Sequence, residues 1–185
     1  MGWFSKTKLN SDLQLFLSEF PTWAAVQSTE LITKLETEDT NGWAEILEDN
    51  SAKLKLIDCL IGANLFYLRT TPEGALASLL FGVDFLEKSL PSLPNQAKGC
   101  FVLAYNFYEK ETQSGNTFTS SLEDWYKIKI DSLDACVAFV IEHEFNSGEE
   151  FNLLFESLLP TLNHLRIQQI EWLMAMSEKW SKAKK

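Results

Sequence analysis

The sequence predicts an all-α protein of about eight helices, packed as antiparallel hairpins in a helical bundle or a short solenoid-like array. Residues that start and stop helices recur along the chain, while glycine (8) and proline (5) are scarce among its 185 residues. Apolar residues make up 45% of the sequence, which is enough for a substantial core. Short alternating runs such as Tyr126-Lys-Ile-Lys-Ile130 lie in a helical context, so we expect no sheet.

The first two predicted helices meet at Pro21. Ser11-Asp12 opens an apolar run over residues 13–20 that precedes this proline, and a second helix with apolar spacing covers residues 22–35. A proline inside a helix removes one hydrogen bond and clashes with the preceding turn, so the first helix should end there. We therefore expect a hairpin over residues 11–37, followed by a loop.

The next predicted hairpin covers residues 52–90, after a short helical turn at 43–47. Its first helix is strongly apolar and runs to about residue 69. Thr71-Pro72-Glu73 then gives a capping hydroxyl, a proline at the first helical position and an acid in the first turn. This helix is expected to run to about residue 90.

The second half of the chain contains one ambiguous segment, residues 121–145. No helix-breaking residue occurs there, so the segment forms either one long helix or two helices with an unmarked bend. Pro160 is expected to kink or split the helix that follows. The predicted division is a single domain over residues 1–185, with hairpins at 11–37, 52–90, 95–131 and 132–160 and a C-terminal helix at 161–182.

Three stretches of similar sequence each begin with a cysteine. Cys59, Cys100 and Cys136 are separated by 41 and 36 residues, a spacing found in helical-hairpin repeats. The cysteines are odd in number, lie in apolar runs and form no Cys-x-x-Cys pair. We expect buried, reduced thiols that face the core.

Two of these stretches resemble the first helix of tetratricopeptide-type repeats, which carries Leu-Gly-x-x-Tyr. Ile61-Gly62-x-x-Leu65 and Leu103-Ala104-x-x-Phe107 approximate that motif. The repeat is longer here than in the family, and its closing proline is displaced. The resemblance covers at most residues 54–162 and implies a scaffold that binds peptides or proteins. The alternative is a helical bundle that reuses small and aromatic residues without a true repeat.

The charge is strongly acidic and unevenly distributed. The net charge is −10, but residues 9–178 carry 26 acidic and 10 basic side chains, and the remaining lysines lie near the two ends. Such a body repels nucleic acid and favours a basic protein partner, unless the acidity serves only to keep the protein in solution. Aromatic and basic residues at the ends leave peripheral membrane contact as a minor alternative.

Catalytic signatures are missing from the sequence. The two histidines, His143 and His164, belong to no Glu-x-x-His motif, and no nucleophile elbow or phosphate loop occurs. We therefore expect no enzyme activity, no cofactor and no metal. The sequence begins without a hydrophobic signal segment and has no run long enough to span a membrane, which predicts a cytoplasmic protein.

Five polar residues interrupt the apolar runs. They either line a polar groove or have a structural role, as hydrogen bonds between helices that fix the packing register or as the polar face of a helix. We favour the structural role. These residues are Asp58, Asn64, Asp84, Asn106 and Asp134.

The predicted protein-binding site consists of Glu109, Glu111, Glu123 and Asp124, which flank the loop at residues 113–120. Loops on rigid scaffolds often carry function, and four acids there concentrate negative potential. Reversing the charge of Glu109 and Glu111 should leave folding intact. The leading hypothesis is a binding protein such as an immunity or antitoxin-like inhibitor, an adaptor or a chaperone. The alternative is a helical-bundle enzyme or small-ligand binder with an aromatic-lined pocket.

Overall fold

The computed structural model describes residues 3–38, 42–81, 84–115, 120–121, 123–124, 131–145 and 151–182. Within these ranges the regular elements are eight α-helices and one short 3₁₀ helix, which confirms the all-α class. Their bounds are α1 Trp3–Glu38, α2 Trp43–Ile46, α3 Asn50–Thr70, α4 Pro72–Phe81, α5 Phe85–Ser89, η1 Leu90–Ser92, α6 Asn95–Ser114, α8 Ser132–Phe145 and α9 Phe151–Lys182.

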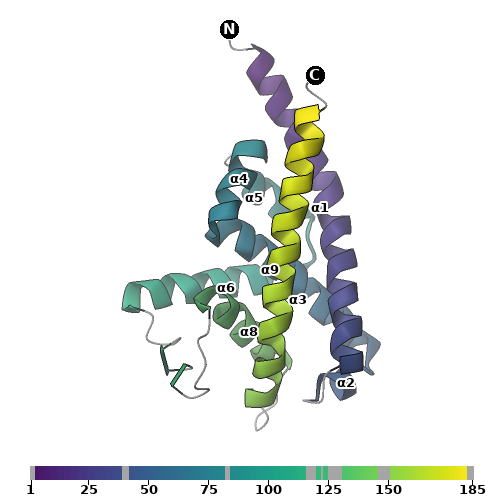
Figure 1. The fold of residues 1–185 in the computed structure, drawn as a ribbon, viewed down its shortest axis with the longest axis vertical. Coiled ribbons are helices and arrows are strands. Elements are labelled where there is room, and N and C mark those ends of the chain that lie inside the picture. Colours follow the sequence, from purple (N-terminus) through teal and green to yellow (C-terminus); the bar gives the residue numbers. More distant parts are fainter. Residues whose placement is uncertain are drawn as a thin grey trace.

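Two long helices run along the molecule in opposite directions. Helices α1 and α9 lie side by side and bring the two ends of the chain together at one end of the structure (Figure 1). Helices α4 and α5 flank the half nearer to these ends, and α6 and α8 lie beside the other half (Figure 1).

Helix α3 is enclosed by the other helices. Ten consecutive residues, 59–68, are buried. Because ten residues cover nearly three turns, they point in every direction around the helix axis. Helices α1, α4, α6, α8 and α9 all pack against α3, which is therefore the centre of the core.

A close helix contact in the core is made at Gly62 of α3. A Cβ atom at this position would collide with the carbonyl oxygen of Ala97 and lie 3.1 Å from the Cβ of Cys100. The missing side chain thus allows the backbones of α3 and α6 to approach each other directly. Of the described contacts between elements, the one between α3 and α6 is the most extensive.

The predicted break at Pro21 is wrong, and so is the hairpin over residues 11–37. Helix α1 continues through Pro21 as one helix of 36 residues. An internal proline costs about 3 kcal/mol. Buried side chains on both sides of it, including Phe16, Phe20, Ala24 and Leu31, form one packed stripe along α1, and their burial outweighs that cost.

Pro160 likewise lies inside a continuous helix, α9, so no separate helix begins at residue 161. The predicted boundaries 132–160 and 161–182 are therefore replaced by α8 and one long α9. The expected helix to residue 90 is also divided, since α4 ends at Phe81 and α5 begins at Phe85.

The ambiguity over residues 121–145 is resolved at Asp131. This residue is not helical, its carboxylate accepts a hydrogen bond from the amide of Leu133 (2.9 Å), and its carbonyl accepts one from Ala135 (2.9 Å). Asp131 thus caps α8, and one continuous helix over the segment is excluded. The alternating run at residues 126–130 lies outside the described residues.

Asp49 caps α3 in the same way, by accepting a hydrogen bond from the amide of Ser51 (2.9 Å). The predicted start at Pro72 is confirmed, since α4 begins there. Helix α6 ends at Gly115, whose φ of 77° is readily adopted only by glycine. None of the helices in the described residues is long and apolar enough to cross a membrane.

Candidate functional site

Three of the four carboxylates predicted to form the binding site reach the surface. Glu109 and Asp124 are exposed and Glu123 is half-buried. Glu111 is buried, with only 3% of its surface accessible, and the thiol of Cys136 donates a hydrogen bond to its Oε2 (3.3 Å). Its placement on an exposed acidic surface was therefore wrong.

The burial of Glu111 follows from the face of α6 on which it lies. Ala97, Cys100 and Ala104 are buried on that helix at helical spacing, and Glu111 comes two turns after Ala104. That face packs against α3 and α8. The spacing from the buried small residues is the sequence signal that predicts an inward-facing carboxylate.

A different surface gathers exposed apolar and acidic side chains, and we call it the α4/α9 face. On α9 it comprises Ile167, Glu171, Met174 and Glu178, which are all exposed and follow each other at intervals of four, three and four residues. Such intervals place side chains in one stripe along a helix. Met174 is 59% exposed and Ile167 is 46% exposed.

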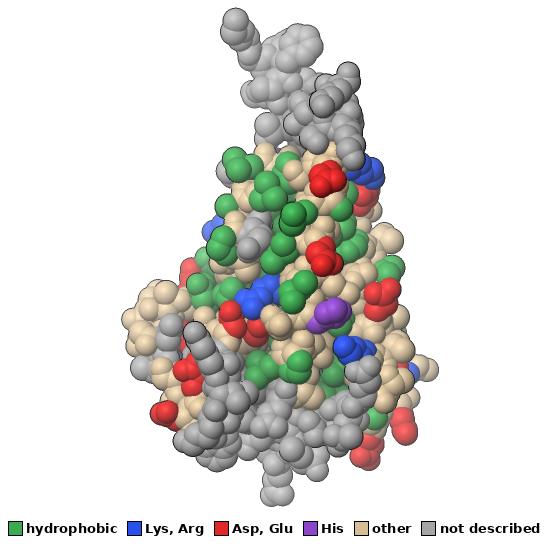
Figure 2. All heavy atoms as spheres, viewed as in Figure 1, with side chains coloured by type: hydrophobic (Ala, Val, Ile, Leu, Met, Phe, Trp, Pro, Cys, Tyr) green, Lys and Arg blue, Asp and Glu red, His purple; other side chains and the backbone are tan. Residues whose placement is uncertain are grey.

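Helix α4 packs against α9, and we include its exposed side chains in this face. It contributes Leu79, which is 84% exposed, the largest value for a bulky apolar side chain in the described residues. Glu73 is the only ionisable residue in α4. A helix so apolar is normally buried on all sides. Figure 2 shows hydrophobic side chains gathered over α4, α5 and α9 with a few acidic ones among them.

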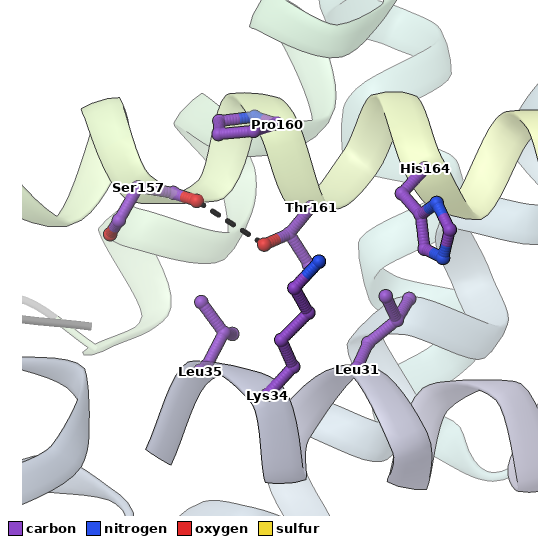
Figure 3. A pocket seen from close by; sticks show the side chains of 7 residues that line it. All are labelled: Leu31, Lys34, Leu35, Ser157, Pro160, Thr161 and His164. Carbon is purple, nitrogen blue, oxygen red and sulfur yellow. Dashed lines mark hydrogen bonds between the residues drawn. The ribbon is translucent and has the colours of Figure 1, made fainter. Parts of the chain in front are cut away.

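A small cleft of about 270 Å³ separates α1 from α9 near Pro160 (Figure 3). Leu31, Leu35 and Pro160 give it apolar walls, and Lys34 and His164 are its ionisable residues. The hydroxyl of Thr161 donates to the carbonyl of Ser157 (3.2 Å). Among the described residues that line this cleft there is no phenylalanine, tyrosine or tryptophan, so this part of its lining differs from the aromatic-lined pocket of the alternative hypothesis.

Two of the five polar residues in apolar runs form hydrogen bonds between helices. The side-chain amide of Gln169 in α9 donates to both the side-chain oxygen (2.9 Å) and the backbone oxygen (2.7 Å) of Asn64 in α3. Asp134 in α8 is bound by side chains of α3 and α9. The expected structural role therefore holds for both. Asp58 and Asp84 are half-buried, and Asn106 is exposed.

Asp134 lies in a buried electrostatic network. The hydroxyl of Tyr67 donates to its Oδ1 (2.8 Å), and Nη2 of Arg166 lies 3.3 Å from its Oδ2. Arg166 also binds Asp131 (3.0 Å) at the start of α8. Burial raises the pKa of Asp134 from 3.8 to about 6, because desolvation outweighs the stabilisation that Tyr67 and Arg166 give to its charged form.

The comparisons with known proteins give no relative. No family model, no curated protein and no solved structure matches this chain.

Because Glu111 is buried and Glu109 is exposed, the same charge reversal should have a large effect on stability at Glu111 and a small one at Glu109. Glu111→Lys should lower the free energy of unfolding by about 3–5 kcal/mol, because it buries an ammonium group beside the Cys136 thiol. Glu109→Lys on the exposed face of the same helix should change it by less than about 0.5 kcal/mol. Urea unfolding of both variants measures the difference. Equal stability of the two variants would contradict the burial of Glu111.

The raised pKa of Asp134 predicts that the free energy of unfolding depends on pH. The pKa of its carboxyl group is higher in the folded protein than in the unfolded chain. The stabilisation of the folded protein by this group is therefore fully present below about pH 4 and is lost as the pH rises through about 6. Asp134→Asn does not titrate and keeps an acceptor for Tyr67. Relative to this variant, the wild type should lose up to about 3 kcal/mol between about pH 4 and pH 7.

Urea unfolding at several pH values tests this expectation. Asp124→Asn, which removes an exposed carboxylate, serves as the control. A constant difference between the wild type and Asp134→Asn would show that the carboxyl group of Asp134 titrates normally in the folded protein.

Proposed function

We propose that this protein is a non-enzymatic binding protein whose partner is another protein that presents a basic amphipathic helix. The observation that carries the proposal is the α4/α9 face, where strongly exposed apolar side chains lie in line with carboxylates. Exposed apolar surface of this kind marks interaction sites, since water contact with it is unfavourable.

The spacing along α9 indicates which partner would fit. Ile167 and Met174 are two helical turns apart, and Glu171 lies between them. A partner helix with apolar residues at matching intervals would cover both aliphatic side chains, as in helix-in-groove recognition. Lysine or arginine beside its apolar stripe would then meet Glu171. Charge complementarity therefore favours a basic partner, as the acidity of the whole body does.

The biological role that fits this surface is the stable binding of a second protein. An immunity or antitoxin-like inhibitor, an adaptor and a chaperone all act by holding a second protein, and an acidic surface would exclude nucleic acid from the same site. The three cysteines are free thiols, which supports the cytoplasmic location that we propose. The resemblance to tetratricopeptide-type hairpins remains a prediction.

A second candidate function is the binding of a small anion with an apolar body. The cleft between α1 and α9 favours it, because this acidic protein places Lys34 and His164 there and the described residues that line the cleft include no carboxylate. Its apolar walls and its volume suit a small ligand.

Binding of a synthetic amphipathic helix tests whether the α4/α9 face or the C-terminal end of α6 is the binding site. The probe is a fluorescent peptide with leucine on one face, flanked by lysine, and its control carries glutamate in place of lysine. Glu171→Lys should weaken binding of the lysine peptide about three- to tenfold, because it turns attraction into repulsion. The matched reversal Glu109→Lys should leave the affinity within about twofold. The effect of Glu171→Lys should shrink as salt shortens the Debye length.

Apolar contact is tested by a second matched pair. Leu79→Ser on α4 should weaken binding of the lysine peptide, whereas Leu54→Ser on α3, another exposed leucine, should not. Fluorescence anisotropy gives the affinities, and circular dichroism confirms that each variant is folded. Loss of binding in Glu109→Lys but not in Glu171→Lys would assign the interaction to α6. Absence of binding by the wild type would overturn the proposal.

A further inference from the structure

Met174 lies within the exposed stripe of the α4/α9 face. Its side chain is 59% exposed, and on α9 it follows Glu171 by three residues and precedes Glu178 by four. These intervals make the two carboxylates its neighbours on the helix surface. Most of the Met174 side chain therefore lies in water, at the part of the protein that the proposed partner would cover.

A sulfur atom distinguishes Met174 from the other apolar side chains of this face. Of the bulky apolar side chains that are exposed in the described residues, Met174 is the only one that contains sulfur. Leu79 and Ile167 carry saturated hydrocarbon side chains, which dilute peroxide does not attack. A thioether is instead oxidised to a sulfoxide, which is a polar group. Oxidation can thus change this one residue of the face from apolar to polar.

Met176 provides a natural contrast. It comes two residues later on the same helix and points to nearly the opposite side, where only 4% of its surface is accessible. The cysteines are buried as well, namely Cys59, Cys100 and Cys136. Of the sulfur-containing side chains in the described part of the chain, Met174 is thus the one exposed to an oxidant in water.

We propose that Met174 is a modification site, at which a small hydroperoxide forms methionine sulfoxide and thereby weakens binding of the partner to the α4/α9 face. The inference rests on the proposed function, because the effect on binding requires that this face contacts the partner. The sulfoxide oxygen accepts hydrogen bonds, and the neighbouring carboxylates of Glu171 and Glu178 can only accept them too. An apolar side chain of the partner would therefore remove the hydrogen bonds of the sulfoxide to water without replacing them.

The oxidation balances as the transfer of one oxygen atom. The sulfur of Met174 attacks one oxygen of hydrogen peroxide, so that the S–O bond forms as the O–O bond breaks. The leaving hydroxide takes the proton of the transferred oxygen and departs as water. The thioether is oxidised and the peroxide is reduced. Methionine sulfoxide reductases reverse the step with a dithiol as reductant, which becomes a disulfide while the oxygen leaves as water.

Peptide mapping by tandem mass spectrometry tests whether the site is selective. The folded protein is treated with hydrogen peroxide for increasing times, and the sulfoxide is quantified at Met174 and Met176. Met174 should be oxidised at least about tenfold faster, because Met176 reacts only after local opening of the fold. In the urea-unfolded chain, which has no such protection, the two rates should agree within about twofold. Equal rates in the folded protein would overturn the proposal.

Binding of the fluorescent lysine peptide tests the consequence for the α4/α9 face. Oxidation of the wild type should weaken this binding at least about threefold, because a polar group replaces apolar contact area. Treatment with methionine sulfoxide reductases should restore it. Met174→Leu keeps an apolar side chain without sulfur, so its affinity should be the same before and after treatment with peroxide. Met174→Gln, which is polar from the start, should weaken binding without any oxidant.

Circular dichroism before and after oxidation separates a local effect from unfolding. Weaker binding with an unchanged helical signal supports the proposal, whereas loss of the helical signal would overturn it. Selective oxidation of Met174 with unchanged peptide binding would overturn this inference alone. Failure of the unoxidised wild type to bind the peptide would overturn the proposed function and, with it, the regulation proposed for this site.

Discussion

The close approach of α3 and α6 at Gly62 is the constraint on which the rest of the structure depends. Helix α3 is buried on all sides, so its position fixes where the helices around it can lie. A side chain at Gly62 would meet the backbone of α6 itself, which cannot move aside as a flexible side chain can.

Side-chain hydrogen bonds then fix the packing register of α8 and α9 against α3. Asn64 is bound by Gln169 of α9, and Tyr67 by Asp134 of α8. Each bond satisfies a group whose burial without a partner would cost free energy, so sliding a helix along α3 would leave donors and acceptors unpaired. Apolar packing supplies most of the stability in this arrangement, and these few bonds select one register. The α4/α9 face lies outside this arrangement, and its aliphatic side chains are exposed.

Local sequence rules predicted the class and several helix ends, because residues such as Pro72 act within one turn of the backbone. They failed where tertiary packing decides. The helix-breaking penalty of Pro21 is outweighed by the burial of side chains along both halves of α1, and a rule based on neighbouring residues does not include that burial. Glu111 was assigned to the surface from its position near a loop, although its spacing from Ala104 indicates the buried face. The α4/α9 face could not be predicted, since it requires knowing that α4 packs on α9.

Two glycine substitutions test the contact of α3 with α6 most directly. Gly62 and Gly99 both lie in helices, but a Cβ atom at Gly99 would meet nothing within 4 Å. Gly99→Ala should raise the free energy of unfolding by up to about 1 kcal/mol, because alanine loses less backbone entropy on folding. Gly62→Ala should lower it by about 1–3 kcal/mol, because the added methyl forces the two helices apart. Chemical unfolding that shows the same stabilisation for both variants would contradict a close approach at Gly62.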